Sequence, residues 1–390
     1  MALDYDAELV EALRRVYGDD VGAFLESLRR PGRRLYARVN TLRIDPESLV
    51  ESLRRRGIEV FIDEDLREAV YFLVEGPASV EPREPYVVAD KYAAESVYVG
   101  SDLYAPGVLA CDESIDRGTE VTVVAQNGLV VARGVAAMSC DEMLAAQRGL
   151  AVRVIEPVYR APRLGDLPEV ANGLLYPQSL PAMYVAHVLD PQPGETIVDM
   201  CAAPGGKASH VYELARGRVR IVAVDHSRAR LEKMRRLLET LGHRGIELLH
   251  ADSRYLHLDY PTLRADRVIV DPPCSSLGVR PKVFDSKTYR EVEALSRYQI
   301  QFLRTAARIV KRGGVIVYST CTVTVEENEA VIESVVEETR CLEVEDTGVV
   351  RGSRGVWGVH RDLYTRFHPH IHDVTGFFIA KLRKTCDETS

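Results

Sequence analysis

The sequence predicts an α/β protein whose largest part is a mostly parallel β-sheet covered by helices on both faces. From about residue 164 onward, apolar strand-like runs alternate with helical segments at the spacing of βαβ units. Before that point the pattern changes twice, from mixed helices and strands to a series of short β runs. With 390 residues and 46% hydrophobic content, the chain has enough material for two or three buried cores.

Residues 1–88 are expected to form a small α+β unit. Residues from about 5 to 30 carry apolar side chains at helical spacing, and residues 38–43 read as a strand. A helix is predicted over residues 46–56, where Pro46 suits a first helical turn, and short strands follow to about Val88.

Residues 89–163 are expected to form a compact β-barrel. Asn127-Gly128 lies between two apolar runs and is a strong signal for a β-hairpin. The predicted strands of this unit are residues 96–99, 107–110, 120–124 and 129–134.

Residues 164–390 are expected to form the parallel sheet. Its predicted strands are residues 196–200, 220–224, 247–250, 267–270, 314–318 and 376–380.

Composition narrows the protein class. The N-terminus has no basic segment followed by an apolar one, and no apolar run approaches the roughly 20 residues of a spanning helix, so a cytoplasmic protein without a membrane partner is expected. The seven cysteines form no Cys-x-x-Cys pair and no Cys/His cluster, which predicts neither a metal site nor a disulfide framework; Cys111, Cys140 and Cys341 are expected to be small buried side chains. Arginine exceeds lysine and there are only ten Asn and Gln residues, a bias compatible with life at high temperature.

The charge pattern leaves two interpretations open. A net charge of −8 argues against a general nucleic-acid binder. Between Gly205 and Arg244, however, ten basic residues stand against four acidic ones. They form either a solvated helix face or a track for phosphates, and charge alone does not decide between them.

The first strand of the sheet runs into Cys201-Ala202-Ala203-Pro204-Gly205-Gly206-Lys207, just before a predicted helix. Ligands bind at the carboxyl ends of strands in open parallel sheets, and a Gly-rich turn lets the backbone approach them. The next two strands end at Asp225, which suits a ribose diol, and at Asp252, which suits an adenine amino group. Structural turns and helix caps are the alternative roles of these residues.

Two cysteines follow the next strands. Asp271-Pro272-Pro273-Cys274 combines an acid and exposed carbonyls, which suit the edge of an extruded base, with a thiol. Ser319-Thr320-Cys321 brings a second thiol to the same edge of the sheet. Because a thiolate readily adds to C6 of a pyrimidine, this pair predicts base chemistry.

The sequence resembles the Nop2/Sun family of RNA cytosine-C5 methyltransferases at residues 201–207, Asp225, Asp252, 271–274 and 320–321 taken together. The resemblance covers residues from about 173 to 382, and Arg38-Val39-Asn40-Thr41-Leu42 is similar to that family's N-terminal motif. It implies a Rossmann-like class I methyltransferase domain. The middle unit resembles a PUA domain, an RNA-binding barrel that this family carries at this place in its sixth subfamily and that subfamily's archaeal relatives.

The resemblance implies S-adenosylmethionine as cofactor and a tRNA cytosine near the 3′ acceptor end as target, with a monomeric enzyme. Cys321 is implied as the nucleophile, Cys274 as the residue that assists its release, and Asp271 as the residue that holds the base. Lys207 is implied to orient the base or the nucleophile, with a phosphate or structural role as the alternative. The implied cofactor-binding residues are Cys201, Ala202, Ala203, Pro204, Gly205, Gly206, Lys207, Asp225, Arg230, Asp252 and Asp271, and the implied RNA-binding residues are Lys91, Tyr92, Tyr104, Ala105, Pro106 and Gly107.

Three other functions share some of these features. Amino-group methylation of adenine also uses an Asp-Pro-Pro motif, but an aromatic residue then stands where Cys274 is found, and Cys321 would have no role. A non-catalytic RNA-binding protein would be expected to lose one of the two cysteines. Ribosomal RNA is the rival substrate for the same chemistry.

Overall fold

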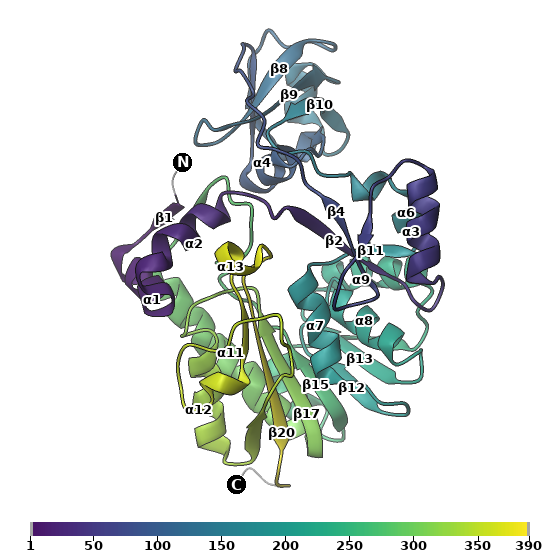
Figure 1. Ribbon diagram of the computed structural model, residues 1–390, viewed down its shortest axis with the longest axis vertical. Helices are drawn as coiled ribbons and strands as arrows, with labels where there is room; N and C mark the ends of the chain where they lie inside the picture. The colour runs from purple at the N-terminus through teal and green to yellow at the C-terminus, as the bar shows by residue number, and fades with distance from the viewer. Residues whose placement is uncertain (1–2, 388–390) are drawn as a thin grey trace.

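The computed structural model describes residues 3–387; Met1, Ala2 and residues 388–390 lie outside this range. Figure 1 shows a large α/β body with a smaller unit at one end, containing β8, β9 and β10. No helix within residues 3–387 is long and apolar enough to cross a membrane.

The large sheet has the strand order β14-β13-β12-β15-β17-β20-β18, with β19 paired to β20. The strands from β14 to β17 run parallel and β20 is antiparallel to β17, so the predicted α/β sheet is confirmed. The strands are β12 (Thr196–Asp199), β13 (Arg220–Asp225), β14 (Ile246–His250), β15 (Ala265–Val270), β17 (Val310–Thr320), β18 (Leu342–Glu345), β19 (Thr365–Phe367) and β20 (Phe377–Lys384).

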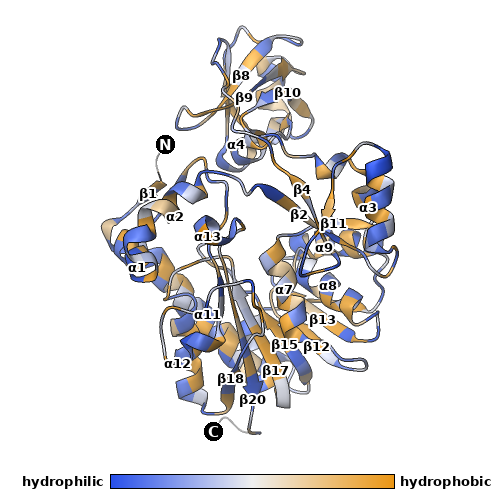
Figure 2. Cartoon of the chain, in the orientation of Figure 1, coloured by the Kyte–Doolittle hydropathy of each residue, from blue (hydrophilic) through white to orange (hydrophobic). Residues whose placement is uncertain are grey.

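Helices cover both faces of this sheet, and two apolar clusters fill the space between them. The apolar colour of β12, β15 and β17 in Figure 2 reflects strands that are buried on both faces. The helices of this part of the chain are α6 (Pro168–Ala171), α7 (Leu180–Leu189), α8 (Gly206–Leu214), α9 (Arg228–Leu241), α10 (Leu256–Asp259), α11 (Tyr289–Ile309), α12 (Glu329–Thr339) and α13 (Pro369–His372).

The N-terminal region contributes to two packed layers. Helices α1 (Ala7–Tyr17) and α2 (Val21–Leu28) pack through an apolar cluster onto Leu277, Val292 and Val323. The strands β2, β3 and β4 of this region form a separate sheet with β11, from later in the chain, in the order β11-β2-β4-β3, and α3 packs on it. Their bounds are β2 (Arg34–Val39), α3 (Pro46–Arg55), β3 (Phe61–Ile62), β4 (Ala69–Leu73) and β11 (Leu175–Pro177).

The strand predicted over residues 38–43 is displaced in the structure, because β2 ends at Val39. Asn40 ends it: its side-chain amide donates to the carbonyls of Gly173 and Leu241, each at 3.0 Å. The backbone then turns toward α3, whose predicted start at Pro46 is confirmed.

The middle unit is a barrel-like sheet of order β6-β10-β9-β8-β5-β7, and its predicted hairpin is confirmed between β8 and β9. The strand predicted over residues 96–99 is wrong, because residues 91–98 form α4. Asp90 caps this helix by accepting a hydrogen bond from the backbone N–H of Ala93, and Val97 and Tyr98 are buried in the unit's core. Packing and the cap therefore override a β-favouring composition.

The strands predicted over residues 107–110, 120–124 and 129–134 correspond to β7, β8 and β9, whereas β6, β10 and α5 were not predicted. The elements of the unit are β5 (Tyr86–Ala89), α4 (Lys91–Tyr98), β6 (Leu103–Tyr104), β7 (Val108–Cys111), β8 (Glu120–Ala125), β9 (Val130–Ala136), α5 (Cys140–Ala145) and β10 (Leu150–Pro157).

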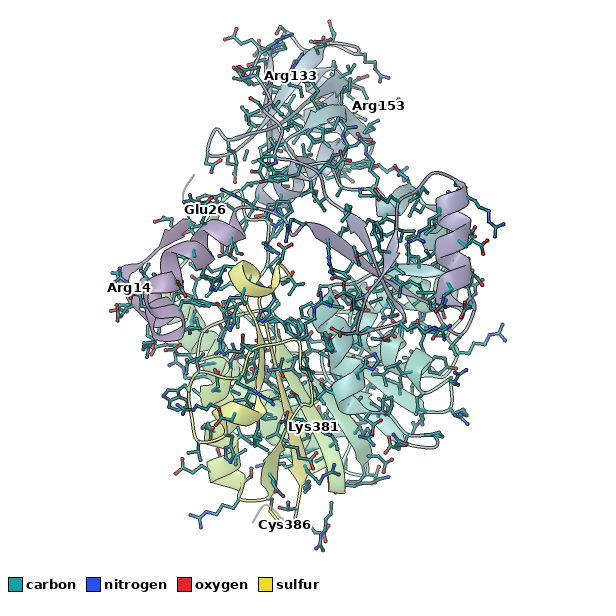
Figure 3. The ribbon with its side chains drawn as sticks, in the orientation of Figure 1. Arg14, Glu26, Arg133, Arg153, Lys381 and Cys386 are labelled. Carbon is teal, nitrogen blue, oxygen red and sulfur yellow. A yellow bond between two sulfur atoms is a disulfide. The ribbon has the colours of Figure 1, made fainter. Side chains whose placement is uncertain are left out.

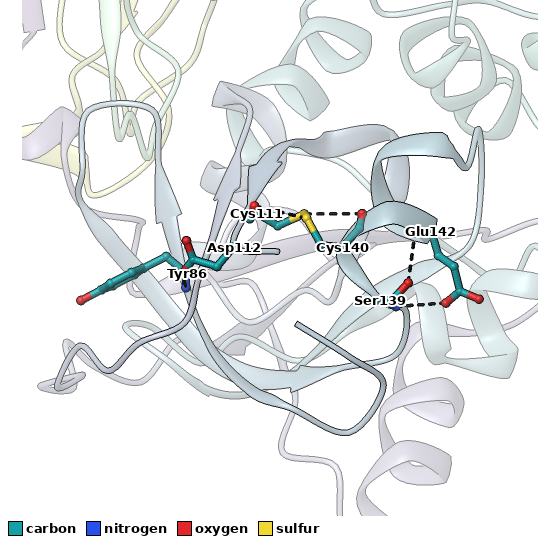
Figure 4. Close-up of a disulfide and its surroundings, with 6 residues drawn as sticks. All are labelled: Tyr86, Cys111, Asp112, Ser139, Cys140 and Glu142. Carbon is teal, nitrogen blue, oxygen red and sulfur yellow. Dashed lines mark hydrogen bonds between the residues drawn. A yellow bond between two sulfur atoms is a disulfide. The ribbon is translucent and has the colours of Figure 1, made fainter. Parts of the chain in front are cut away.

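The cysteines correct a further prediction. Cys111 and Cys140 form a disulfide between β7 and α5, beside the capping box of Ser139 and Glu142 (Figure 4). Cys341 is joined to Cys386 near the end of the chain. The partners lie 29 and 45 residues apart in sequence, so no local cysteine spacing predicts either disulfide.

The seven cysteines all lie within residues 3–387, and Cys201, Cys274 and Cys321 are free. Unfolded protein without reductant should therefore release three titratable thiols to Ellman's reagent, and reduced protein seven. Seven thiols without reductant would contradict both disulfides.

Replacing Cys111 and Cys140 by Ser should lower the free energy of unfolding by about 2–4 kcal/mol, measured by urea denaturation.

Candidate active site

The carboxyl ends of β12, β13, β15 and β17 surround one pocket of about 340 Å³. The pocket joins the loop after β12 to both cysteines singled out in the sequence. Its lining residues are Met200, Cys201, Ala203, Pro204, Asp225, His226, Arg230, Asp252, Ser253, Asp271, Pro272, Pro273, Cys274, Ser276, Tyr298, Phe302 and Cys321. Among the predicted residues, Ala202, Gly205, Gly206 and Lys207 do not line it.

Backbone geometry explains the glycines of the loop. Gly205 has φ of +113°, a conformation that disfavours other residues, and it lies against the side chain of Met234. A Cβ on Gly206 would lie 3.1 Å from the ring of Tyr176. These two glycines thus let the chain turn sharply from β12 into α8 beneath the pocket.

Arg38 supports this loop from below. Its fully buried guanidinium donates to Glu213 Oε1 and Oε2, both at 2.9 Å, to Ser209 Oγ at 2.8 Å and to the carbonyl of Gly206 at 2.8 Å, and it also contacts Gln178. This ion pair joins β2 of the N-terminal sheet to α8. The motif around Arg38 therefore has a structural role in supporting the loop after β12.

Asp225 has the geometry of a hydroxyl acceptor. Its Oδ1 accepts from the backbone N–H of Ser227 at 2.9 Å, whereas Oδ2 is buried and accepts no hydrogen bond, although Arg230 Nη1 lies 3.1 Å from it. Arg230 also donates to the carbonyl of Ala203. The buried, unused oxygen fits a ribose hydroxyl, which would supply the missing donor.

Asp252 has protein partners of its own. Its carboxylate pairs with Arg254 at 2.6 Å and accepts from that residue's backbone N–H at 3.1 Å. The hydrogen bonds from Arg254 lower the pKa of Asp252. Asp252 therefore also caps the short helix that follows it, which is its alternative role. The rings of Tyr298 and Phe302 line the same pocket as Asp252, and the sequence analysis did not identify them.

Cys274 and Cys321 meet in the pocket, with their sulfur atoms 3.4 Å apart. Ser276 Oγ lies 3.4 Å from Cys321 Sγ. The hydrogen bond from Cys274 lowers the pKa of Cys321 although burial opposes ionisation, and the same contact, together with burial, raises the pKa of Cys274. The contact therefore favours ionisation of Cys321 over ionisation of Cys274.

Lys207 and Asp271 form a partly buried ion pair beside the cysteines. Lys207 Nζ lies 2.6 Å from Asp271 Oδ2, and Ser319 Oγ donates to Asp271 Oδ1 at 2.8 Å. Asp271 and other nearby acids raise the pKa of Lys207 in spite of burial, which favours an ammonium cation beside the cysteines. Below them, burial raises the pKa of Asp199 to about 7.

Glu327 is a residue that the sequence analysis missed. Its fully buried carboxylate accepts from the backbone N–H of Ser275 at 2.9 Å, from Gln299 at 3.0 Å and from Thr322 at 3.3 Å. Ser275 follows Cys274 and Thr322 follows Cys321, so one carboxylate ties the two cysteine-bearing loops together. Nothing in its sequence setting, Glu326-Glu327-Asn328-Glu329, distinguishes it from an exposed acid.

The predicted RNA-binding residues are split in the structure. Tyr92 and Tyr104 are 77% and 57% exposed, whereas Ala105 and Gly107 are buried. Lys91 lies 2.5 Å from Asp285 and so already has an anionic partner. On the strands of the same unit, Arg133 and Arg153 are labelled in Figure 3, and Arg133 pairs with Glu120 and Glu156.

Tyr104 also lines a second cavity, of about 590 Å³, where the three parts of the chain meet. Three arginines from three regions line this cavity as well: Arg34, Arg163 and Arg280.

A His/Glu group lies away from the pocket. His187 and His210 place their Nε2 atoms 2.5 and 3.0 Å from one oxygen of Glu68. Tetrahedral zinc holds N and O ligands at about 2.0–2.2 Å, which separates the ligand atoms by about 3.3 Å from one another. The shorter distances fit a carboxylate that accepts hydrogen bonds from two imidazoles, and burial lowers the pKa of His210 to about 3.

Comparison with known proteins identifies the family. Residues 186–383 match the model of the 16S rRNA methyltransferase RsmB/F, residues 85–158 match the PUA domain, and residues 6–81 match the ferredoxin-like domain of RsmF/B-like methyltransferases. The chain belongs to the RsmB/F methyltransferase family. The predicted methyltransferase fold, with a PUA domain and an α+β N-terminal unit, is thereby confirmed.

Relatives within the RsmB/F family match over nearly the whole chain. A tRNA (cytosine(72)-C(5))-methyltransferase of Pyrococcus horikoshii is 42% identical, with 99% of this chain and all of the relative covered. The mouse tRNA (cytosine(72)-C(5))-methyltransferase NSUN6 is 29% identical, covering 88% and 83% of the two chains. The crystal structure of NSun6 from P. horikoshii with SFG superposes with a TM-score of 0.91 over 98% of this chain and 99% of that one.

Glu327→Gln tests the support of the cysteine loops. The amide keeps the size of the side chain but replaces an accepting oxygen by a donor, so we expect a loss of about 1.5–3 kcal/mol in the free energy of unfolding. We also expect the rate of Cys321 alkylation by iodoacetamide to change, because the two sulfurs lose their fixed separation. Glu337→Gln, the same change on the exposed side of α12, is the control. Equal stability and equal alkylation rates in the two variants would refute the support by Glu327.

Proposed function

We propose that the protein is an S-adenosylmethionine-dependent tRNA (cytosine-C5)-methyltransferase that modifies position 72, near the 3′ acceptor end. The observation that carries this proposal is the pair of sulfurs 3.4 Å apart in the same pocket as Asp225 and the loop after β12. The P. horikoshii and mouse relatives, which carry this activity in their names, support the choice of nucleotide. The expectation of a cytoplasmic, monomeric enzyme belongs to the same proposal.

The residues present fit the cofactor. Asp225, with its unused Oδ2, would hold the ribose, and the loop from Cys201 to Lys207 would hold the methionine part. Asp252, with the rings of Tyr298 and Phe302, would hold the adenine. Arg230 fixes Ala203 and Asp225 relative to one another. S-adenosylmethionine supplies an electrophilic methyl group when bound.

Cys321 would begin the reaction by adding its thiolate to C6 of the cytosine, which makes C5 nucleophilic. Asp271, held by Lys207 and Ser319, would bind the N3 and amino edge of the base and stabilise the adduct. After C5 has gained the methyl group, Cys274 would assist removal of the C5 proton. The electrons of that C–H bond re-form the C5–C6 double bond, and Cys321 leaves as a thiolate.

RNA would reach the pocket from the PUA domain. Tyr92 and Tyr104 present exposed rings on which unpaired bases stack. The large cavity beside Tyr104, with its three arginines, lies between this domain and the methyltransferase domain. Ribosomal RNA is the second candidate substrate, because the family model is named for a 16S rRNA enzyme and an Arabidopsis rRNA methyltransferase is 25% identical over 97% of this chain.

The two cysteines should have opposite phenotypes. Cys321→Ala should abolish methylation of a pool of unmodified tRNAs, because no nucleophile remains. Cys274→Ala should accumulate a covalent protein–RNA adduct, visible as a slower band on a denaturing gel, because release of Cys321 is blocked. Bisulfite sequencing locates the product. Normal turnover of Cys274→Ala without an adduct would contradict the role assigned to Cys274. Methylation of ribosomal RNA but not of tRNA would show that ribosomal RNA is the substrate.

Tyr92→Ala and Tyr104→Ala test the RNA surface. Loss of a stacked base costs about 1–3 kcal/mol, so each change should raise the KM for tRNA roughly fivefold or more while leaving kcat nearly unchanged. Leu144→Ala, an exposed apolar side chain on α5 of the same domain, is the matched control. If tRNA methylation by both tyrosine variants equals that of the control, the PUA contacts are wrongly assigned.

A further inference from the structure

One chain segment runs from the cysteines to the PUA domain. We call residues 278–287 the bridging segment. At its start, the N–H of Gly278 donates to the carbonyl of Cys321 at 3.0 Å, and the carbonyl of Gly278 accepts from Gly376 at 2.8 Å. A Cβ on Gly278 would lie 2.3 Å from the carbonyl oxygen of Gly376, so the backbones are in close contact. The bridging segment is therefore fixed to the backbone of the candidate nucleophile.

Farther along, the bridging segment enters the core of the PUA domain. Val283 is 1% exposed and packs in the apolar cluster of that domain. Within the described residues, it is the only fully buried member of this cluster from outside residues 87–159. Its carbonyl accepts from the side-chain amide of Asn127, at the β8–β9 hairpin, at 3.0 Å. The PUA core is thus completed by the methyltransferase domain.

Asp285 then joins three parts of the chain. Its carboxylate lies 2.5 Å from Lys91 of the PUA domain and 3.0 Å from Lys282, and it accepts from the hydroxyl of Tyr5 at 2.9 Å. β16 (Asp285–Lys287) also pairs with β1 (Leu3–Tyr5). Burial opposes ionisation of Asp285, but the two ammonium groups keep its pKa below the usual range. A buried anion between two cations is a strong tie, because removing it leaves like charges facing each other.

We propose that Val283 and Asp285 are positioning residues that fix the PUA domain relative to Cys321 and thereby set which nucleotide of a bound RNA reaches the thiolate. The inference rests on the proposed function for its substrate. If the PUA domain holds the RNA end, the rigid span to Cys321 measures the distance from that end to the reacting base. It also reassigns Lys91, whose ammonium serves Asp285 and not an RNA phosphate.

Asp285→Asn and Lys91→Gln, singly and together, test this role. Each should lower kcat/KM for tRNA roughly tenfold to a hundredfold, because small misplacements of reacting groups have effects of that size. Bisulfite sequencing should show methylation spreading to neighbouring cytosines, a change that simple loss of stability would not cause. The double variant should be no worse than either single one, because both residues act through one contact. Val283→Ala should spread the product in the same way, and Glu142→Gln, which breaks the surface pair with Arg117, is the control.

Small-angle X-ray scattering of the same proteins gives a readout without RNA. Asp285→Asn should increase the maximum dimension, because the PUA domain gains freedom, whereas the control should match the wild type. An unchanged scattering curve together with an unchanged product site would overturn the inference. If adding Lys91→Gln to Asp285→Asn lowered kcat/KM for tRNA further, Lys91 would act on the RNA independently of Asp285. If wild-type protein methylates no tRNA, the proposed function and the choice of nucleotide both fail, and scattering still decides whether the bridging segment holds the domain.

Discussion

The active-site geometry depends on one buried carboxylate. Glu327 has no access to solvent, and it accepts hydrogen bonds from the segments after both Cys274 and Cys321. Together with the backbone hydrogen bond from Gly278 to Cys321, these contacts hold two loops that leave different strands, and so they hold the sulfurs in their 3.4 Å contact. Burial raises the pKa of Glu327, and the donors of Ser275, Gln299 and Thr324 counter that effect. This buried acid thus helps to set how close the two sulfurs lie.

The same principle extends to the joints between the parts of the chain. Arg38 ties the N-terminal sheet to the loop that would hold the cofactor, and Asp285 ties the PUA domain to the segment after Cys274. Both are ion pairs largely removed from water, where breaking one partner costs far more than at a surface. The contacts therefore favour one relative placement of cofactor, nucleophile and RNA-binding surface. Apolar packing alone, which is not directional, would specify that placement less sharply.

The sequence was informative where local pattern and topology agree. Apolar runs predicted the strands of the large sheet, and because parallel strands share an edge, residues as distant as Cys201 and Cys321 were expected in one place. The sequence was uninformative where long-range packing determines the structure. The segment around Val97 has a strand-like composition but becomes helical through the Asp90 cap and burial. The disulfides and Glu327 depend on partners many residues away, which no spacing rule reveals.

The charge balance of the pocket explains why two cysteines are needed. Asp199, Asp225 and Asp271 surround the loop after β12, so the field there disfavours another anion, and Lys207 is already paired with Asp271. A lone buried thiol would remain protonated, as the raised pKa of Cys201 illustrates. The contact with Cys274 offsets this by lowering the pKa of Cys321. In the proposed reaction, the bond between Cys321 and C6 would remove that acceptor before methyl transfer, so Cys274 would already be free of this contact when the C5 proton leaves. One contact would therefore prepare Cys321 and, once it is lost, free Cys274 for its later step.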